Sequence, residues 1–370
     1  MAGETLSTIL NALSQVMAPD LYRQWNRTTY LLRMLQARTG AITDGIGKNC
    51  AFDVEFTGAT AQTVAEGSDV PASEFAQDIN EPMLMPWATY RTSFQISEQE
   101  VDAARTSVGT ADALRDLFGA RLLSANAILA RQIESDMLTG TGVDGNGNPT
   151  LIGVFGGALT ASGAYGGLSP ATYSEWASTQ LTNGGTARTL TPALMASADQ
   201  LIFTAASLPW NAIVTSAGVV SKYEQFFTTG AAFGTQQPLI RMQDNPASPQ
   251  YGMGVPNDPT MQLTNLYWKG QPVVRNPVAP TGKMAFLNTD FIKIKYLPHV
   301  PTRNEIEFLE NIGLQGSTGG NQVIQATGLQ ARIVELGKTG DSHKLSARIT
   351  LAAAFVRRNA MAIIQDISET

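Results

Sequence analysis

Two histidines, His299 and His343, are the side chains that could act as general bases at neutral pH. They lie in different segments of the chain, and no plausible nucleophile stands near either of them in the sequence. A general base must come within hydrogen-bonding reach of the proton that it removes. We therefore interpret both histidines as surface or packing residues, and the sequence predicts no catalytic site.

Metal ligands are also scarce. A zinc site needs three or four ligands, mostly cysteine and histidine, whereas the chain has one cysteine, Cys50, and two histidines. The run from Asp144 to Asn148 begins like a calcium-binding loop, but Pro149 stands where that loop needs glycine and Phe155 where it needs glutamate. We predict a turn here, with no metal site and no cofactor.

The longest predicted helix ends in a glycine-rich turn. Apolar residues keep helical spacing over residues 111–138, which at about 1.5 Å per residue extend roughly 42 Å. The glycines that follow lack the Gly-x-Gly-x-x-Gly spacing and come after a helix, so phosphate binding is not expected. A long helix followed by a tight turn back into an apolar run suggests a structural role and not a binding pocket. Its charged residues are predicted to form a solvated face: Asp112, Arg115, Asp116, Arg131 and Glu134.

Two adjacent segments carry opposite charge. Residues 21–50 contain five basic side chains and one acidic, whereas residues 51–90 contain seven acidic side chains and neither Lys nor Arg. Complementary charge sets the register of an interface more than its affinity, so we predict that the basic segment of one copy lies on or near the acidic segment of another. The predicted contact residues are Arg23, Arg27, Arg33, Arg38, Asp53, Glu55, Glu66, Asp69, Glu74, Asp78 and Glu81.

Two other interpretations of these charges remain open. The segments are independently solvated faces, since exposed ion pairs contribute only ~0 to 1 kcal/mol each, or the arginines face nucleic acid.

Local patterns predict the remaining elements. An apolar stripe over residues 6–17 indicates an amphipathic helix, which packs either on its own domain or on a partner, and the alternation of residues 52–57 indicates a strand. The polar stretch after that strand is too long for an ordinary loop of a compact domain. Further predictions are helices at 193–206 and 219–227, a buried strand at 212–215, a strand at 291–296, and strands over 348–367 broken at Arg357-Arg358-Asn359. The alternation of strand and helix around residue 212 indicates an α/β unit.

The composition favours an oligomer. Charged residues make up 15% of the 370 residues, against roughly 25% in typical domains. The formal net charge of -6 argues against a protein whose main role is to bind nucleic acid.

A single cysteine excludes an intramolecular disulfide. No apolar run approaches the ~18 residues of a membrane span, and the first five residues lack the basic region of a signal peptide.

Two segments have the layout of a known family. Residues 138–154 are a leucine, a glycine-rich turn and a Gly-Val return, and residues 266–291 contain Gly-Gln-Pro-Val, Pro-Thr-Gly and Asp-Phe in that order. Together they resemble the tailed-phage major capsid proteins of the Hong-Kong-97-type fold. In that family a Gly-Asp-Gly-type turn follows the long spine helix, and here Gly140-Thr141-Gly142 stands in its place.

The resemblance implies an α+β fold in five parts: an N-terminal arm (1–50), an extended β-hairpin loop (51–94), a peripheral domain with the spine helix (95–188), an axial domain (189–283), and a return to the peripheral domain with closing strands (284–370). It implies a structural, non-enzymatic protein that self-assembles as pentamers and hexamers into an icosahedral head around double-stranded DNA. In the family the arm reaches across neighbouring subunits, and the loop lies over an adjacent one.

The partners implied are further copies of the chain, a portal protein, and packaged DNA bound without sequence specificity, but no membrane. Separate scaffolding and decoration proteins are optional partners in the family. Some family members form an isopeptide bond from a lysine of the extended loop. Residues 49–90 contain no lysine, so we expect non-covalent contacts. Since the arm is short, we expect a separate scaffolding protein or none. Assembly is expected in the bacterial cytoplasm, and the final location is the virion.

Two alternative functions stay open. An encapsulin-type compartment for protein cargo would share the fold, but the long acidic loop and the N-terminal arm disfavour it. A secreted β-rich hydrolase or carbohydrate-binding module would need a signal peptide and a convergent pair of carboxylates.

Overall fold

The computed structural model describes residues 30–36, 38, 40–57, 79–97, 99, 110–228, 266–297, 323–324, 329–330, 332–339 and 342–369. The chain divides into two compact units. The first comprises Met1–Leu32, Thr89–Glu134 and Tyr296–Leu351, and the second comprises Arg33–Ala88, Ser135–Lys295 and Ala352–Thr370. The predicted helix at residues 6–17 and His299 lie outside the described residues, as does the side chain of His343.

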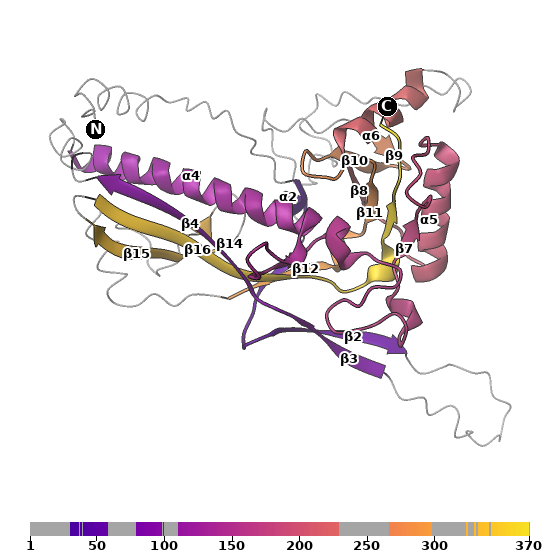
Figure 1. Ribbon diagram of the computed structural model, residues 1–370, viewed down its shortest axis with the longest axis horizontal. Helices are drawn as coiled ribbons and strands as arrows, with labels where there is room; N and C mark the ends of the chain where they lie inside the picture. Colours follow the sequence, from indigo (N-terminus) through magenta and orange to yellow (C-terminus); the bar gives the residue numbers. More distant parts are fainter. Residues whose placement is uncertain are drawn as a thin grey trace. The chain divides into compact units, whose positions relative to one another are not determined.

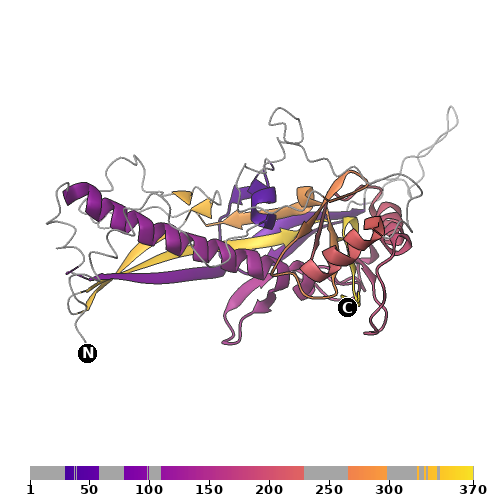
Figure 2. The ribbon, with the colours of Figure 1, turned by 90° about the horizontal axis from the view of Figure 1, so that it is seen from above.

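The first unit is built from a long helix and antiparallel strands. Its elements are α4 (Thr110–Thr139), β4 (Ala88–Ser97), β15 (Arg332–Thr339), β16 (Ser342–Phe355), and the short pair β13 (Val323–Ile324) and β14 (Leu329–Gln330). Strand β16 pairs with β15 and with β4. Figures 1 and 2 both show α4 lying along β4 and β16. The helix predicted over residues 111–138 is therefore confirmed.

One face of α4 is apolar where its side chains are described. Ala125, Leu129, Ile133 and Met137 are buried, and their spacing of four residues places them on one side of a helix. Glu134 is also fully buried. The prediction that Glu134 belongs to a solvated face is therefore wrong, because its carboxylate has hydrogen-bond partners far away in the sequence.

The second unit contains a six-stranded mixed sheet. The strand order is β7 (Thr179–Leu181), β17 (Ala362–Ile364), β11 (Met284–Leu287), β8 (Ala212–Thr215), β10 (Gln271–Arg275) and β9 (Tyr267–Trp268). Strand β8 is parallel to β10 and antiparallel to β11. Helices α5 (Pro192–Ala206) and α6 (Ala217–Thr228) belong to the same unit. The predicted α/β unit, with its two helices and buried central strand, is confirmed.

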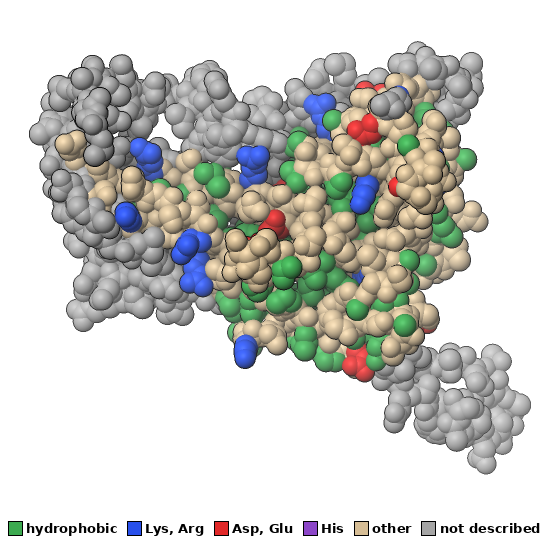
Figure 3. All heavy atoms as spheres, in the orientation of Figure 1, with side chains coloured by type: hydrophobic (Ala, Val, Ile, Leu, Met, Phe, Trp, Pro, Cys, Tyr) green, Lys and Arg blue, Asp and Glu red, His purple; other side chains and the backbone are tan. Residues whose placement is uncertain are grey.

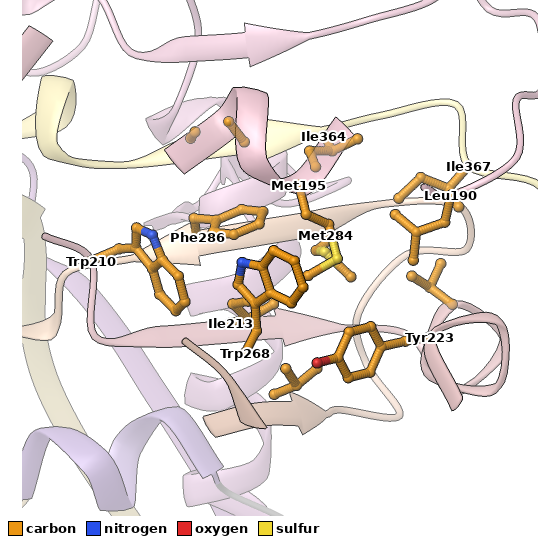
Figure 4. Close-up of a cluster of buried hydrophobic side chains, with 14 of the residues drawn as sticks. Leu190, Met195, Trp210, Ile213, Tyr223, Trp268, Met284, Phe286, Ile364 and Ile367 are labelled. Atoms are coloured by element: carbon orange, nitrogen blue, oxygen red, sulfur yellow. The ribbon is translucent and has the colours of Figure 1, made fainter. Parts of the chain in front are cut away.

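The core of this unit lies between the sheet and its helices (Figure 4). Trp210 and Phe286 meet edge to face, with ring centroids 5.2 Å apart. Met195, Ile213 and Met284 are fully buried in the same cluster. The cluster therefore joins side chains that are far apart in the sequence, and their packing holds the strands that carry them together in one sheet.

The other described elements complete the two units. They are α2 (Tyr30–Gln36), β1 (Ile42–Asp44), β2 (Cys50–Thr57), β3 (Ile79–Met85), β5 (Thr141–Val143), β6 (Pro149–Ile152), the π-helical turn η2 (Val154–Ala158), β12 (Ile292–Tyr296), and the 3-10 turns η3 (Ser174–Trp176), η5 (Thr289–Phe291) and η6 (Arg358–Ala360). Strands β2 and β12 confirm the predicted strands at 52–57 and 291–296. Strands β16 and β17 on either side of η6 confirm the predicted break at residues 357–359.

In the glycine-rich stretch that follows α4, backbone segments pack directly against one another at the end of the helix. A Cβ atom on Gly156 would lie 1.9 Å from the carbonyl oxygen of Gly140, and one on Gly140 would lie 2.3 Å from that of Leu151. Glycine is required because the backbones approach too closely for any side chain. In the β5–β6 hairpin the Asp144 carboxylate accepts both the backbone N–H and the side-chain Nδ2–H of Asn148, at 2.7 and 2.8 Å. The predicted turn is confirmed.

Candidate assembly surface

The β2–β3 hairpin has one buried and one exposed face. Phe52 and Val54 of β2 are buried, as are Met83 and Met85 of the paired strand. The alternate residues face outward and are exposed: Ala51, Asp53, Glu55, Asn80, Pro82 and Leu84. On the face of the molecule in Figure 3, hydrophobic side chains gather around the position of β2 and β3. The outer face of the hairpin therefore combines two carboxylates with Leu84, whose exposed fraction is 48%.

Aromatic stacking anchors the hairpin to its own subunit. The ring of Phe56 stacks on that of Tyr173, with centroids 4.3 Å apart and planes 9° from parallel. The Tyr173 hydroxyl donates a hydrogen bond to Glu81 Oε1 at 3.0 Å. This hydrogen bond raises the pKa of Tyr173, because losing the proton would place two negative charges together. One tyrosine thus holds both strands of the hairpin.

A second contact holds β3, where its backbone lies close to that of Gly166. The N–H of Leu84 donates to the carbonyl of Gly166 at 2.9 Å. Gly166 has φ +62°, and a Cβ atom there would lie 2.0 Å from Cγ of Met83. Lys295 holds β2 in turn, since its Nζ donates to the carbonyl of Ala51 at 2.7 Å. The base of the hairpin is therefore rigidly placed within the second unit.

The structure describes only part of the predicted contact set. Asp53 and Glu55 are exposed on the outer face of the hairpin. Glu81 accepts from Tyr173, and Arg38 pairs with Asp290 at 2.9 Å, so both have partners within the chain. The structure does not bring the described members of the set together in one contact. The others lie outside the described residues, or in the case of Arg33 have an undescribed side chain: Arg23, Arg27, Arg33, Glu66, Asp69, Glu74 and Asp78.

A buried arginine organises the loop that follows η2. Arg358 is fully buried, and its guanidinium donates to the carbonyls of Ala158 at 2.6 Å and of Thr160 at 2.8 Å. It also lies over the rings of Tyr165 and Trp176, 5.3 Å from each centroid. Burial lowers the pKa of Arg358 to about 10, so it remains charged at neutral pH. Carbonyl oxygens and aromatic faces replace its hydration shell.

Sequence reasoning missed both Arg358 and Glu134. Arg358 appeared only as part of a polar break between strands, and Glu134 only as one of several charges on a helix. An arginine between the apolar end of one strand, residues 351–355, and the apolar strand Ala362–Ile364 is a weak signal of burial, and it would not have identified the carbonyl partners.

The described residues offer no evident site for chemistry. Within them no three histidine, cysteine, aspartate or glutamate side chains are grouped to hold a metal ion. Nor does any described helix have the length and apolar character to cross a membrane.

One family model matches residues 18–336 of the chain, and its description is SU10 major capsid protein. No curated protein sequence matches the chain.

Solved capsid structures share the fold. The capsid asymmetric unit of cyanophage A-1(L) is 18% identical, with a TM-score of 0.68 over 95% of this chain and 96% of that one. A capsid chain of the native GTA particle is 12% identical, with a TM-score of 0.54 over 94% and 93%. The capsid of Myoviridae phage XM1 is 10% identical, with a TM-score of 0.51 over 99% and 100%. The α+β architecture is thus the Hong-Kong-97-type capsid fold.

Proposed function

Because the chain belongs to the family of SU10 major capsid proteins, we propose that it forms pentamers and hexamers that close an icosahedral phage head around double-stranded DNA. As a phage major capsid protein it is a structural virion component and not an enzyme. Its fold is that of proteins that assemble into oligomeric shells. The observation that carries the proposal is the family match across most of the chain.

The charge of the chain supports a container for DNA. Nucleic-acid binding is driven by Lys and Arg that neutralise phosphates, whereas this chain has 25 basic and 31 acidic residues. A shell with this balance encloses DNA without holding it tightly and without reading its sequence. The packaged DNA is therefore a cargo, and shell strength comes from contacts between subunits.

The anchored hairpin supports a role for the extended loop in these contacts. The two strands at its base are held by Tyr173 and Gly166. We assign residues 51–94 to the extended loop and residues 1–50 to the arm. Among the predicted contact residues that the structure describes, Asp53 and Glu55 are the carboxylates that remain exposed, and the basic arm of a neighbour lies on them. The axial domain at 189–283 contributes the contacts around the five-fold and six-fold axes.

The other partners follow from this role. A portal protein fills one vertex, separate scaffolding or decoration proteins support the shell, and assembly takes place in the bacterial cytoplasm. No lysine occurs in residues 49–90, which favours a shell held by non-covalent contacts.

The test is assembly of the purified full-length chain, followed by sedimentation and electron microscopy. Closed shells, or rings of five and six, are expected from the chain alone or after adding the other head proteins of the same phage. A chain that stays monomeric under both conditions would contradict the proposed function.

The loop contact has its own test. The double variant Asp53→Asn with Glu55→Gln should assemble less well than the unsubstituted chain, and the difference should shrink in high salt because the contact is electrostatic. The matched control is Glu175→Gln, which removes an exposed carboxylate from η3. Equal assembly of all three chains would show that these carboxylates make no subunit contact.

A further inference from the structure

The five residues that follow β17 cross other segments of the second unit. We call these residues, 365–369, the strap. The backbone N–H of Gln365 donates to the carbonyl of Leu181 at 2.9 Å, and that of Ile367 donates to the carbonyl of Gly282 at 2.9 Å. In Figure 1 the strap is the yellow end of the chain, which runs toward α6. It therefore bonds to segments that are far from it in the sequence.

The first carboxylate of the strap is held by a loop. The Asp366 carboxylate accepts the backbone N–H groups of Asn183 at 2.7 Å and of Gly185 at 3.1 Å. The N–H of Arg188 donates to the Asp366 carbonyl at 2.7 Å, and the N–H of Ser368 donates to the Arg188 carbonyl at 2.8 Å. The strap thus binds this loop at both of its ends.

The second carboxylate of the strap is held at the start of α6. Glu369 Oε1 accepts the backbone N–H of Gly282 at 2.7 Å and the hydroxyl proton of Ser216. Ser216 precedes α6 and accepts the N–H of Val219 at 3.4 Å. A carboxylate is stabilised at this end of a helix, where the first N–H groups carry partial positive charge. A Cβ atom on Gly218 would lie 2.2 Å from Glu369 Oε2, so the docked carboxylate leaves no room for a side chain there.

Backbone strain and shallow burial distinguish the strap from the strand before it. Asp366 has φ +62°, a conformation that costs free energy in a residue other than glycine. Ile367 is the one apolar residue of the strap, and it lies beside Leu190 in the core cluster (Figure 4). The other four residues are partly exposed, whereas β17 is buried throughout. Segments with few buried apolar contacts open more readily than the core around them.

We propose that the strap is a latch, which opens and closes as one unit while the six-stranded sheet stays folded. Asp366 and Glu369 flank Ile367, so the two carboxylates and the apolar side chain dock together. Closing the latch fixes the loop at residues 183–185, the turn at Gly282 and the start of α6. The strained φ of Asp366 persists only while the surrounding contacts hold it. The latch belongs to the fold of the subunit and does not depend on shell formation.

Amide hydrogen exchange of the full-length chain tests the proposal. Glu369→Ala should accelerate exchange at Gly282, which binds this carboxylate, and equally at Asn183 and Gly185, which bind the other one. The expected acceleration is about tenfold, because a hydrogen bond to a charged acceptor is lost from the closed state. Asp366→Asn should accelerate exchange at the same three amides, including Gly282.

The control is a carboxylate of α6 that is exposed. Glu224→Ala removes it and should leave exchange at the three amides unchanged. The amides of β11 should exchange as slowly in every variant as in the unsubstituted chain, because the sheet stays folded.

Two results would overturn the proposal. Acceleration only at the amides that the substituted carboxylate itself accepts would show that the strap does not open as one unit. Equal acceleration in β11 would show that the strap opens only when the whole unit unfolds. If Glu369→Ala does not fold, Glu369→Gln removes the charge at nearly constant size, and the same comparison of amides decides.

Discussion

The carboxylate of Glu134 accepts a hydrogen bond from the backbone N–H of Leu31 at 2.9 Å, across 103 residues of sequence. Its second oxygen accepts the N–H of Leu32, also at 2.9 Å. The first N–H groups of a helix have no partner within that helix, and α2 begins at Tyr30. A buried carboxylate on α4 therefore satisfies the start of α2 and joins the two helices.

Replacing Glu134 with Ala should destabilise the protein by roughly 2 to 4 kcal/mol, because two buried N–H groups would lose their acceptor. Amide hydrogen exchange at Leu31 and Leu32 should accelerate in the same variant. Arg131→Ala is the control, since Arg131 is exposed one turn earlier on α4. Unchanged exchange at Leu31 and Leu32 in Glu134→Ala would contradict this role.

Gly166→Ala should destabilise the second unit more than Gly167→Ala. Both glycines have positive φ, +62° and +85°, so alanine is strained at either position. At Gly166 the new Cβ would also meet Met83 Cγ at 2.0 Å, whereas at Gly167 nothing lies within 4 Å. The difference between the two free energies of unfolding should be about 1 to 3 kcal/mol, the usual cost of overpacking. Equal free energies of unfolding for the two variants in urea would show that Met83 and β3 shift to accept the new Cβ atom without cost.

Arg358→Met should cost roughly 3 kcal/mol or more, because it removes charge-assisted hydrogen bonds and takes the guanidinium donor away from the buried carbonyl of Ala158. Arg358→Lys should recover only part of this loss, since an ammonium group cannot reproduce the planar arrangement of donors. Arg348→Met on the exposed side of β16 is the control and should change stability little. Chemical denaturation of the three variants measures these differences. Full recovery by lysine would mean that charge alone matters at this position.

The Asp366 carboxylate should make stability depend on acidic pH. Hydrogen bonds from the backbone N–H groups of Asn183 and Gly185 lower its pKa below the ordinary value of 3.8. A carboxyl group with a lowered folded pKa stabilises the protein fully above its unfolded pKa, and this contribution disappears as the pH falls through the folded pKa. Asp366→Asn should therefore be less stable than the unsubstituted chain near neutral pH, and the two should converge as the pH falls through the lowered folded pKa of Asp366. A constant difference from neutral to acidic pH would refute this assignment.

Local patterns predicted the three longest helices and several of the strands correctly. Helices α4, α5 and α6 lie where apolar residues recur at helical spacing, and β2 and β12 lie where they alternate. The turn at Asp144 follows from residues that are close in sequence. These elements depend on contacts within a few residues, and such contacts leave a periodic pattern that can be read directly.

The roles of individual charged residues could not be predicted in this way. Glu134 was expected to be solvated, because a glutamate on a charged helix has the same local pattern whether it is exposed or buried. Its partner lies 103 residues away. Arg358 likewise finds its acceptor at Ala158, 200 residues earlier. Hydrogen bonds of this separation depend on how the elements pack, which no local pattern specifies.

The sequence by itself determined the positions of the long helices and of several strands, the charge balance, and the two stretches that resemble major capsid proteins. Only the tertiary structure decided which side chains are buried partners and which remain exposed. It showed that Glu81 and Arg38 are engaged within the chain, while Asp53, Glu55 and Phe203 are exposed. The physical reason is that exposure and pairing depend on which distant segments pack together, whereas helix and strand periodicity is a property of the segment alone.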